Sequence, residues 1–365
     1  MTLSKNTIST EEQHAFSLFT DICLYQGLHE NLLFSPYSIQ QALSLLSVNT
    51  KDEHILNELS LYTSPNMLNE SLLNTKSNSL ILLNKKYQPY RAYNEMGTVD
   101  IFSSPEDGKQ KLDSFQENFF GKVLNQISPK AEDDFDIFSI LQYAAEWLTP
   151  FTKENTHSRI FHINNSIRNK RVMSMRSQFS HAYGKITNDY EIAALSGKNH
   201  SITYFIKPKT KKENILHELY DLCNHDNELK NTIDLQIPKL TLESTLNLLP
   251  AFEHMGLTYL AKSHSDENYH FTIDNIIDPL RAKTKLNSVS QTVQLHLDEE
   301  RAEVKAATCQ MFCLVSCVPL QPLIIKMDAP YFIVIKDKTT KGKTRIVCTA
   351  WINMPDTTNN ISLLF

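Results

Sequence analysis

The segment LHLDEERAEVKAAT, residues 295–308, joins a strand-like pattern to a run of small side chains. Successive side chains of a strand point to opposite faces, so alternate residues after Glu299 share a face. One face would carry the small or apolar side chains of Ala302, Val304, Ala306 and Thr308, and the other Arg301, Glu303, Lys305 and Ala307. This segment can therefore form a strand with one packed face and one face toward water.

The composition is that of an ordinary folded protein. Of 365 residues, 41% are hydrophobic and 21% are charged, and there are only 8 glycines and 14 prolines. We find no repeat, no low-complexity tract and no linker rich in Gly, Pro or Ser, so one domain over residues 1–365 is expected. The formal net charge is −5, and without a basic stripe nucleic acid is not an expected partner.

No membrane partner is expected either. The N-terminal residues MTLSKNTISTEEQHAFSLF lack the apolar core of a signal peptide. The most apolar stretch, residues 311–327, is interrupted by polar residues and prolines and is shorter than the ~20 residues that span a bilayer. The six cysteines lack the spacing of a disulfide scaffold and favour a reducing compartment. We expect a cytoplasmic protein, with unconventional release from the cell as the alternative.

Helical and strand-like patterns are segregated along the chain. Residues 9–25 have the apolar spacing of a helix, and residues 31–49 run from a short strand into a second helix. Residues 51–79 are expected to form a polar helix, and another helix is expected at 111–126. From residue 138 onward strand patterns dominate. This segregation predicts an α+β fold.

Four segments, in order along the chain, resemble the serpin family of serine protease inhibitors. They are NLLFSPYSIQQALSLL (31–46), SILQYAAEWLTPFTKENTHSRIF (139–161), LQIPKLTLESTLNLLPAFEHMGLTYL (235–260), and LHLDEERAEVKAAT (295–308) together with DAPYFIVIKD (328–337) and AWINMP (350–355). A shorter match is NFFGKVLNQI (118–127). The resemblance implies a serpin fold: a helix-rich N-terminal part packed on a large mixed β-sheet, with further sheets and an exposed reactive-centre loop at about 299–327.

The resemblance also implies roles for particular residues. Ser35 and Ser38 match the shutter serines beneath the main sheet, and Trp147 matches the breach tryptophan. Lys239 and Glu299 match a pair that meets where the loop enters the sheet; two solvated surface charges are the alternative. The hinge that follows comprises Glu299, Arg301, Ala302, Val304, Ala306, Ala307 and Thr308.

Four positions depart from the family pattern and bring the local behaviour of the shutter into question. Ser139 stands where asparagine is usual, Gln291 where histidine is frequent, and Asn49 and Ala350 where glycine is frequent. The stretch after residue 60 is also shortened. The fold itself does not depend on these positions.

A serpin offers its loop as a substrate, and after cleavage the N-terminal part of the loop inserts into the main sheet and drags the acylated protease with it. The usual spacing from Glu299 places the scissile bond at Val315–Ser316, with Leu314–Val315 as the alternative. These apolar residues predict an elastase-like or chymotrypsin-like serine protease, or a cathepsin-like cysteine protease, as the target. No Asp, Arg or Lys lies near the bond, which disfavours caspase-like and trypsin-like targets.

Catalytic motifs are absent. There is no H-E-x-x-H, G-x-S-x-G, P-loop or G-x-G-x-x-G pattern, so an enzyme is not expected. Cys309, Cys313 and Cys317 recur every four residues. Without a nearby His, incidental cysteines or reactive thiols are favoured over a metal site. We expect no metal and no cofactor.

The hinge leaves two functions open. Glycine at position 301 would let the chain bend freely, so Arg301 can slow insertion and turn an inhibitor into a substrate. The first expectation is a monomeric suicide-substrate inhibitor of proteases. The alternative, because of Arg301 and Lys305, is a non-inhibitory binding protein with a serpin fold. The Asn, Lys and Ile content resembles poxvirus-type serpins, which would make this a viral protein that acts on the host in its cytoplasm; intracellular animal serpins have similar features.

Overall fold

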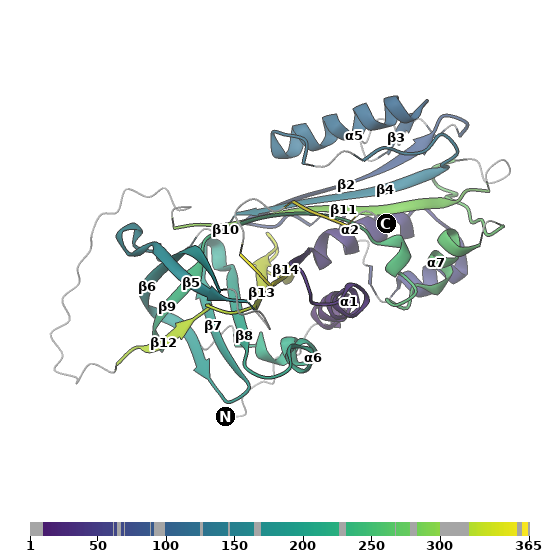
Figure 1. Ribbon diagram of the computed structural model, residues 1–365. Helices are drawn as coiled ribbons and strands as arrows, with labels where there is room; N and C mark the ends of the chain where they lie inside the picture. The colour runs from purple at the N-terminus through teal and green to yellow at the C-terminus, as the bar shows by residue number, and fades with distance from the viewer. Residues whose placement is uncertain are drawn as a thin grey trace.

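The computed structural model describes residues 10–60, 62–63, 67–68, 70–87, 89–90, 99–124, 127–144, 147–163, 169–225, 231–266, 268–277, 283–299, 321–355 and 360–363. In this part of the chain two β-sheets form the body of the molecule, and helices pack on them (Figure 1). The α+β architecture predicted from the sequence is confirmed.

The bounds of the helices and strands follow from the described residues. The helices are α1 (Thr10–Gln26), α2 (Pro36–Ser47), α3 (Glu53–Leu59), α5 (Pro105–Phe120), α6 (Lys212–Leu222) and α7 (Thr258–Ser265). One sheet has the order β1 (Leu32–Phe34), β14 (Thr344–Ile352), β13 (Tyr331–Lys338), β8 (Ile202–Pro208), β7 (Tyr190–Ser196), β6 (Asn169–Ile186), β9 (Asn231–Pro238) and β12 (Leu323–Lys326), with β5 (His157–His162) paired to β6. The other has the order β15 (Asn360–Leu363), β10 (Leu240–Asn247), β11 (Leu286–Leu297), β4 (Phe135–Ala144), β2 (Thr75–Asn84) and β3 (Val99–Phe102).

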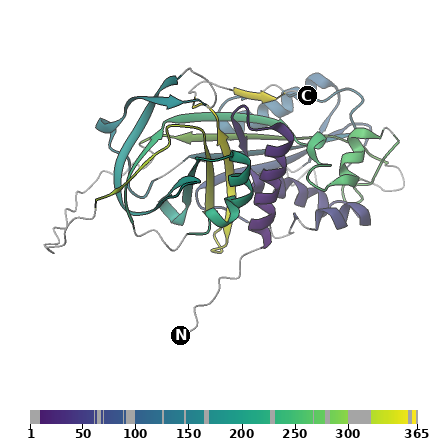
Figure 2. The same cartoon turned by 60° about the horizontal axis from the view of Figure 1, so that its bottom comes forward.

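The first two helices form where the sequence predicts them. Gly27 has a φ of 77°, which ends α1 in the left-handed conformation that glycine adopts readily. Ser35 caps α2 by accepting a hydrogen bond from the Ser38 amide, and Pro36 occupies the first turn, where no amide donor is needed. α1 and α6 lie side by side on the larger sheet (Figure 2).

Two helix predictions are wrong in their extent. The described part of residues 51–79 contains the short helix α3 and a 3₁₀ turn at 67–68 in place of a long helix. β2 begins at Thr75, and its run Leu80–Leu83 is buried on both faces of a sheet. The helix predicted at 111–126 begins earlier, where the Ser104 hydroxyl caps α5, and it ends at Phe120, because Gly121 takes a φ of 75°.

Strands β4 and β11 lie at the centre of the second sheet and run parallel to each other. They pair from Leu286 and Phe135 at one end to His296 and Ala144 at the other. Their other neighbours, β2 and β10, run antiparallel to them. An added strand antiparallel to both would therefore replace one parallel ladder with two antiparallel ladders. We call the β4–β11 pair the seam.

The two faces of the seam are covered differently. Figure 1 shows α5 across one face, over β2 and β4, and α2 beneath the other. The α2 face is buried in the two largest hydrophobic clusters, whereas α5 buries only Gly108, Leu112 and Gln116. α5 packs on a small separate cluster, so its apolar attachment to the sheet is slight. None of the described helices is long and apolar enough to cross a membrane.

The edge strand β12 depends on close packing at Gly184. A Cβ atom added there would lie 2.7 Å from Cγ2 of Ile233 and 3.0 Å from Cδ1 of Ile325. Gly184→Ala should therefore displace β9 and β12 and lower the free energy of unfolding by about 1–3 kcal/mol in urea denaturation. The control Gly121→Asn lies in open space, and Asn tolerates its backbone conformation, so a change within about 0.5 kcal/mol is expected. A Gly184→Ala variant as stable as the parent would contradict this packing.

Candidate functional site

Glu299 and Lys239 meet at the end of the seam from which the predicted loop departs. The Lys239 Nζ and Glu299 Oε2 atoms lie 2.5 Å apart, and the Glu299 side chain is 7% exposed. Burial by itself would raise the pKa of the Glu299 carboxyl, but its interactions with Lys239 and then Thr156 outweigh this and lower the pKa. The two side chains thus form an ion pair in which the carboxylate is buried and the Lys239 ammonium group is 34% exposed.

Trp147 lies at the same end and holds the backbone next to Glu299. Its Nε1 donates a hydrogen bond of 2.9 Å to the carbonyl oxygen of Asp298. The indole is 1% exposed and packs against the rings of Phe151 and Phe205. The chain that follows β11 is therefore anchored at two successive residues, by Trp147 at Asp298 and by Lys239 at Glu299.

His296 adds an anchor that sequence reasoning missed. Its Nε2 lies 2.6 Å from Oδ2 of Asp298, and its Nδ1 lies 2.7 Å from Oγ1 of Thr241. Thr241 faces His296 across the β10–β11 ladder. The contact with Asp298 joins residues two apart on one strand face, so the spacing could have indicated it, whereas only the register of β10 and β11 could have revealed the contact with Thr241.

Ser35 and Ser38, the predicted shutter serines, lie under the middle of the seam in a buried polar cluster. Ser139 of β4 donates to the Ser38 hydroxyl at 2.8 Å, and the Gln291 side chain of β11 donates to the same hydroxyl at 2.9 Å. Gln291 also donates to the Ser35 carbonyl at 2.7 Å and accepts from the Ser35 amide at 3.0 Å. Both strands of the seam are thereby bonded to α2 through Ser38.

Ser139 and Gln291 depart from the family pattern, yet both form hydrogen bonds within the shutter cluster. Both side chains are at most 1% exposed, so each hydrogen bond is made away from water. Asn49 likewise needs no glycine, because its φ is not positive, and Ala350 is fully buried between β1 and β13.

A second polar contact crosses the seam at its other end. The Ser288 hydroxyl of β11 donates to Oδ1 of Asp136 on β4 at 2.6 Å. Asp136 is 2% exposed, and burial raises the pKa of its carboxyl to about 7, although the hydrogen bond from Ser288 opposes this rise. A protonated carboxyl group can thus persist between the two strands near neutral pH.

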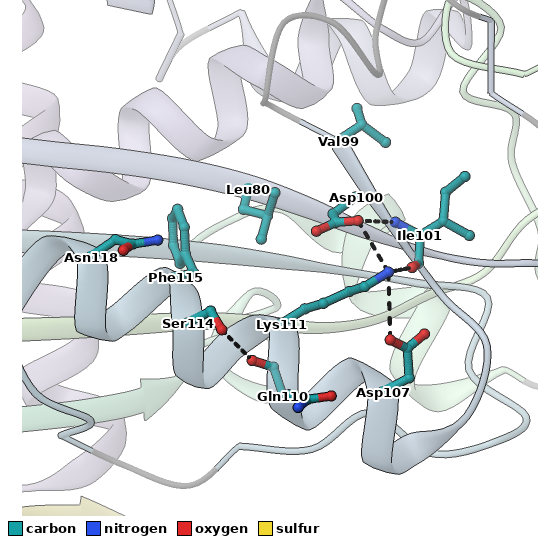
Figure 3. A pocket seen from close by; sticks show the side chains of 10 residues that line it. All are labelled: Leu80, Val99, Asp100, Ile101, Asp107, Gln110, Lys111, Ser114, Phe115 and Asn118. Atoms are coloured by element: carbon teal, nitrogen blue, oxygen red, sulfur yellow. Dashed lines mark hydrogen bonds and ion pairs between the residues drawn. The ribbon is translucent and has the colours of Figure 1, made fainter.

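Lys111 fastens α5 to the outer strand β3. Its ammonium group lies 3.3 Å from the Asp100 carboxylate and 3.6 Å from that of Asp107, and it donates to the Ile101 carbonyl. Figure 3 shows these contacts beside a cavity of about 740 Å³ between α5 and the strands, whose wall includes Leu80 and Phe115. The helix is therefore held by polar contacts where apolar packing is incomplete.

Several predicted residues lie outside the described residues, so their roles stay predictions. They are Arg301, Ala302, Val304, Ala306, Ala307 and Thr308 of the hinge, Leu314, Val315 and Ser316 of the scissile bond, and Cys309, Cys313 and Cys317. Within the described ranges, no group of three or more His, Cys, Asp or Glu side chains is placed to hold a metal ion.

Comparison with known proteins identifies the family. Residues 88–344 match the family model described as "Serpin (serine protease inhibitor)". The chain belongs to the serpin family. It is 22% identical over 365 residues to alpha-1-antitrypsin 1-2 of Mus musculus, covering 90% of this chain and 84% of that protein. It is 24% identical over 363 residues to alpha-1-antiproteinase of Rattus norvegicus, covering 90% and 85%.

Solved structures agree on the serpin fold. Serpin-12 of Manduca sexta superposes with a TM-score of 0.75 at 15% identity, covering 95% of this chain and 99% of that one. The mouse protein-Z dependent protease inhibitor gives 0.75 at 16% identity, covering 95% and 97%. Membership of this family supports protease inhibition, rather than enzymatic catalysis, as the general function of this serpin.

Gln291→Leu should loosen the seam most among single changes in the shutter. It removes three hydrogen bonds and leaves the buried Ser35 amide without its Gln291 partner, while the Ser35 carbonyl keeps the bond from the Ile39 amide, so a loss of about 3 kcal/mol in the free energy of unfolding is expected. Ser139→Ala, which removes one bond, should lose about 1 kcal/mol. Denaturation followed by tryptophan fluorescence measures both. Equal losses would show that Gln291 does not organise the cluster.

Asp136 should make stability depend on pH. Because its folded-state pKa is raised to about 7, it contributes stability in full below pH ~4 that is lost as pH rises through about 7. Asp136→Asn should reduce the slope of unfolding free energy against pH in this window by up to about 1.4 kcal/mol per pH unit. Glu213→Gln on α6, away from the seam, controls for the loss of one carboxylate. Identical slopes for Asp136→Asn and the parent would rule out the raised pKa.

Proposed function

We propose that this serpin inhibits proteases as a suicide substrate. Its loop at about 299–327 would be cleaved at Val315–Ser316, or at Leu314–Val315, and the N-terminal part would then enter the seam as a new strand. The parallel pairing of β4 and β11, with Glu299 anchored directly at their common end, carries this proposal.

The direction of the chain supports insertion. β11 ends at Leu297, beside the end of β4 that leads to Trp147. A chain that turns back after Glu299 would run antiparallel to both strands of the seam. Antiparallel ladders on both sides are at least as favourable per residue as the parallel ladder that they replace.

The alternation after Glu299 fits the two faces of the seam. On the α2 side, Leu141 and Val293 are fully buried, and small side chains such as Ala302 and Val304 suit that face. On the α5 side, Gln142 and Gln294 are partly exposed. The charges of the other face, Arg301 among them, would lie toward this wetter side.

The apolar residues around the proposed bond favour an elastase-like or chymotrypsin-like serine protease, or a cathepsin-like cysteine protease. Incubation with one enzyme of each class tests the mechanism. The expected product is a complex that survives SDS, together with cleavage at Val315–Ser316 or Leu314–Val315 and a rise in the melting temperature of the cleaved protein. Clean cleavage without a complex and without that rise would favour the non-inhibitory binding protein instead.

Arg301→Gly tests whether the hinge limits inhibition. Glycine restores backbone freedom at this position, so fewer inhibitor molecules should be cleaved for each protease molecule trapped. The control Arg301→Ala removes the charge without the same freedom and should trap less efficiently than Arg301→Gly. If the two variants behave alike, the backbone at position 301 does not control insertion.

A further inference from the structure

We propose that four side chains, Lys122, Glu243, Gln294 and Gln142, form a latch that ties the end of α5 to both strands of the seam and must open before a strand can enter. This inference rests on the proposed function, because it concerns what controls the rate of insertion. None of the four residues belongs to the hinge, the breach or the shutter described above.

The latch is a continuous chain of short contacts. The Gln142 side chain of β4 donates to the Gln294 side-chain oxygen of β11 at 2.7 Å. The Gln294 side-chain nitrogen donates to Oε1 of Glu243 on β10 at 2.9 Å. Lys122 Nζ lies 2.6 Å from the same oxygen. Three adjacent strands are thus joined to the residue that follows the Gly121 cap of α5.

The charge at Glu243 decides the direction of every bond. A carboxylate only accepts, so Gln294 must present its NH₂ group to Glu243 and its oxygen to Gln142. Gln142 must then present its own NH₂ group. The orientation of both amides follows from one anion, which Lys122 balances from the outside, and Glu243 is 9% exposed. Loss of the charge would remove the constraint on the whole chain.

The Gln142–Gln294 bond crosses the seam and cannot survive insertion. Adjacent strands lie about 4.8 Å apart, so a strand placed between β4 and β11 roughly doubles the distance between them. A side-chain hydrogen bond of 2.7 Å cannot span that gap. By contrast, the Thr245–Thr292 contact of 2.9 Å on the same face joins β10 to β11, which stay adjacent.

The latch also couples the seam to α5. Lys111 fastens the helix to β3, on one side of the seam, and Lys122 fastens the end of the helix to β10, on the other side. α5 lies over this sheet, above β2 and β4 (Figure 1). The helix buries few side chains and a cavity lies beside it, so these polar ties add to a limited apolar attachment. Release of Lys122 would free the end of the helix. It would also weaken the Gln142–Gln294 hydrogen bond, because Glu243 would no longer be balanced.

Gln142→Met tests the latch, because it removes the Gln142–Gln294 hydrogen bond and keeps a side chain of similar length. The probe is an acetylated peptide with the sequence of residues 300–308, ERAEVKAAT, mixed with the intact protein. Its incorporation is followed by native gel and by the rise in melting temperature. Gln142→Met should take up the peptide about two- to tenfold faster than the parent, the effect of one lost hydrogen bond. Gln294→Met, which loses this bond and the bond to Glu243, should take it up at least as fast.

Thr292→Val is the matched control, since it loses a hydrogen bond on the same face that does not cross the seam. It should take up the peptide at the parent rate. Glu243→Gln should accelerate uptake and remove its dependence on salt, because Lys122 is 54% exposed and its attraction to Glu243 is screened. Far-UV circular dichroism of each variant checks that the fold is retained.

The outcomes separate the latch from the proposed function. If the parent traps a protease but both Met variants match its rate of peptide uptake, or Thr292→Val accelerates uptake equally, the latch is overturned and the function stands. If Glu243→Gln leaves the rate unchanged, the bracing by Lys122 and Glu243 is overturned. If the parent neither traps a protease nor takes up the peptide, both proposals fail.

Discussion

The parallel pairing of β4 and β11 is the constraint on which the rest of this serpin depends. Both strands have antiparallel neighbours on their outer sides, so the centre of the sheet is the place where an antiparallel strand fits on both sides. Without that strand, β4 and β11 satisfy each other's backbone hydrogen bonds. With it, each would pair with the added strand in place of the other. Under the proposed mechanism, the contacts that hold the two strands together also control the entry of the new strand.

Side chains hold the seam at three levels along its length. Near the loop end, Gln142 meets Gln294 on the α5 face. In the middle, Gln291 and Ser139 meet Ser38 on the α2 face, and at the far end Ser288 meets Asp136. Polar contacts suit this position, because a polar group that leaves one partner can find water or a new backbone partner, whereas an interlocked apolar core has no such substitute.

The sequence predicts the parts of this arrangement that are local or that follow a family pattern. α2 is predicted because Ser35 and Pro36 start a helix by themselves. The Lys239–Glu299 contact was expected from the resemblance, and the structure brings the two residues together. The roles of the hinge residues after Glu299 and of the scissile bond remain predictions, since those residues are outside the described part of the chain.

The contacts across the seam could not be predicted, because they depend on strand register. Gln142 and Gln294 are 152 residues apart, and nothing local indicates that they face each other. The same holds for Gln291: it departs from the frequent family residue, yet its side chain lies 2.9 Å from the Ser38 hydroxyl and donates to it. The sequence predicts a helix for residues 75–79 because this half of β2 is polar and lacks the apolar run that marks the buried half of the strand.

Strand β15 has a further consequence for the behaviour of the molecule in concentrated solution. It pairs with β10 from Glu243 to Leu246, so part of the outer edge of this sheet already has a partner from the same chain. An uncovered edge is a template for strands of other molecules, and covering it protects against aggregation. β15, now the edge strand on this side, is only four residues long, so it offers few free backbone groups for pairing with a neighbouring molecule.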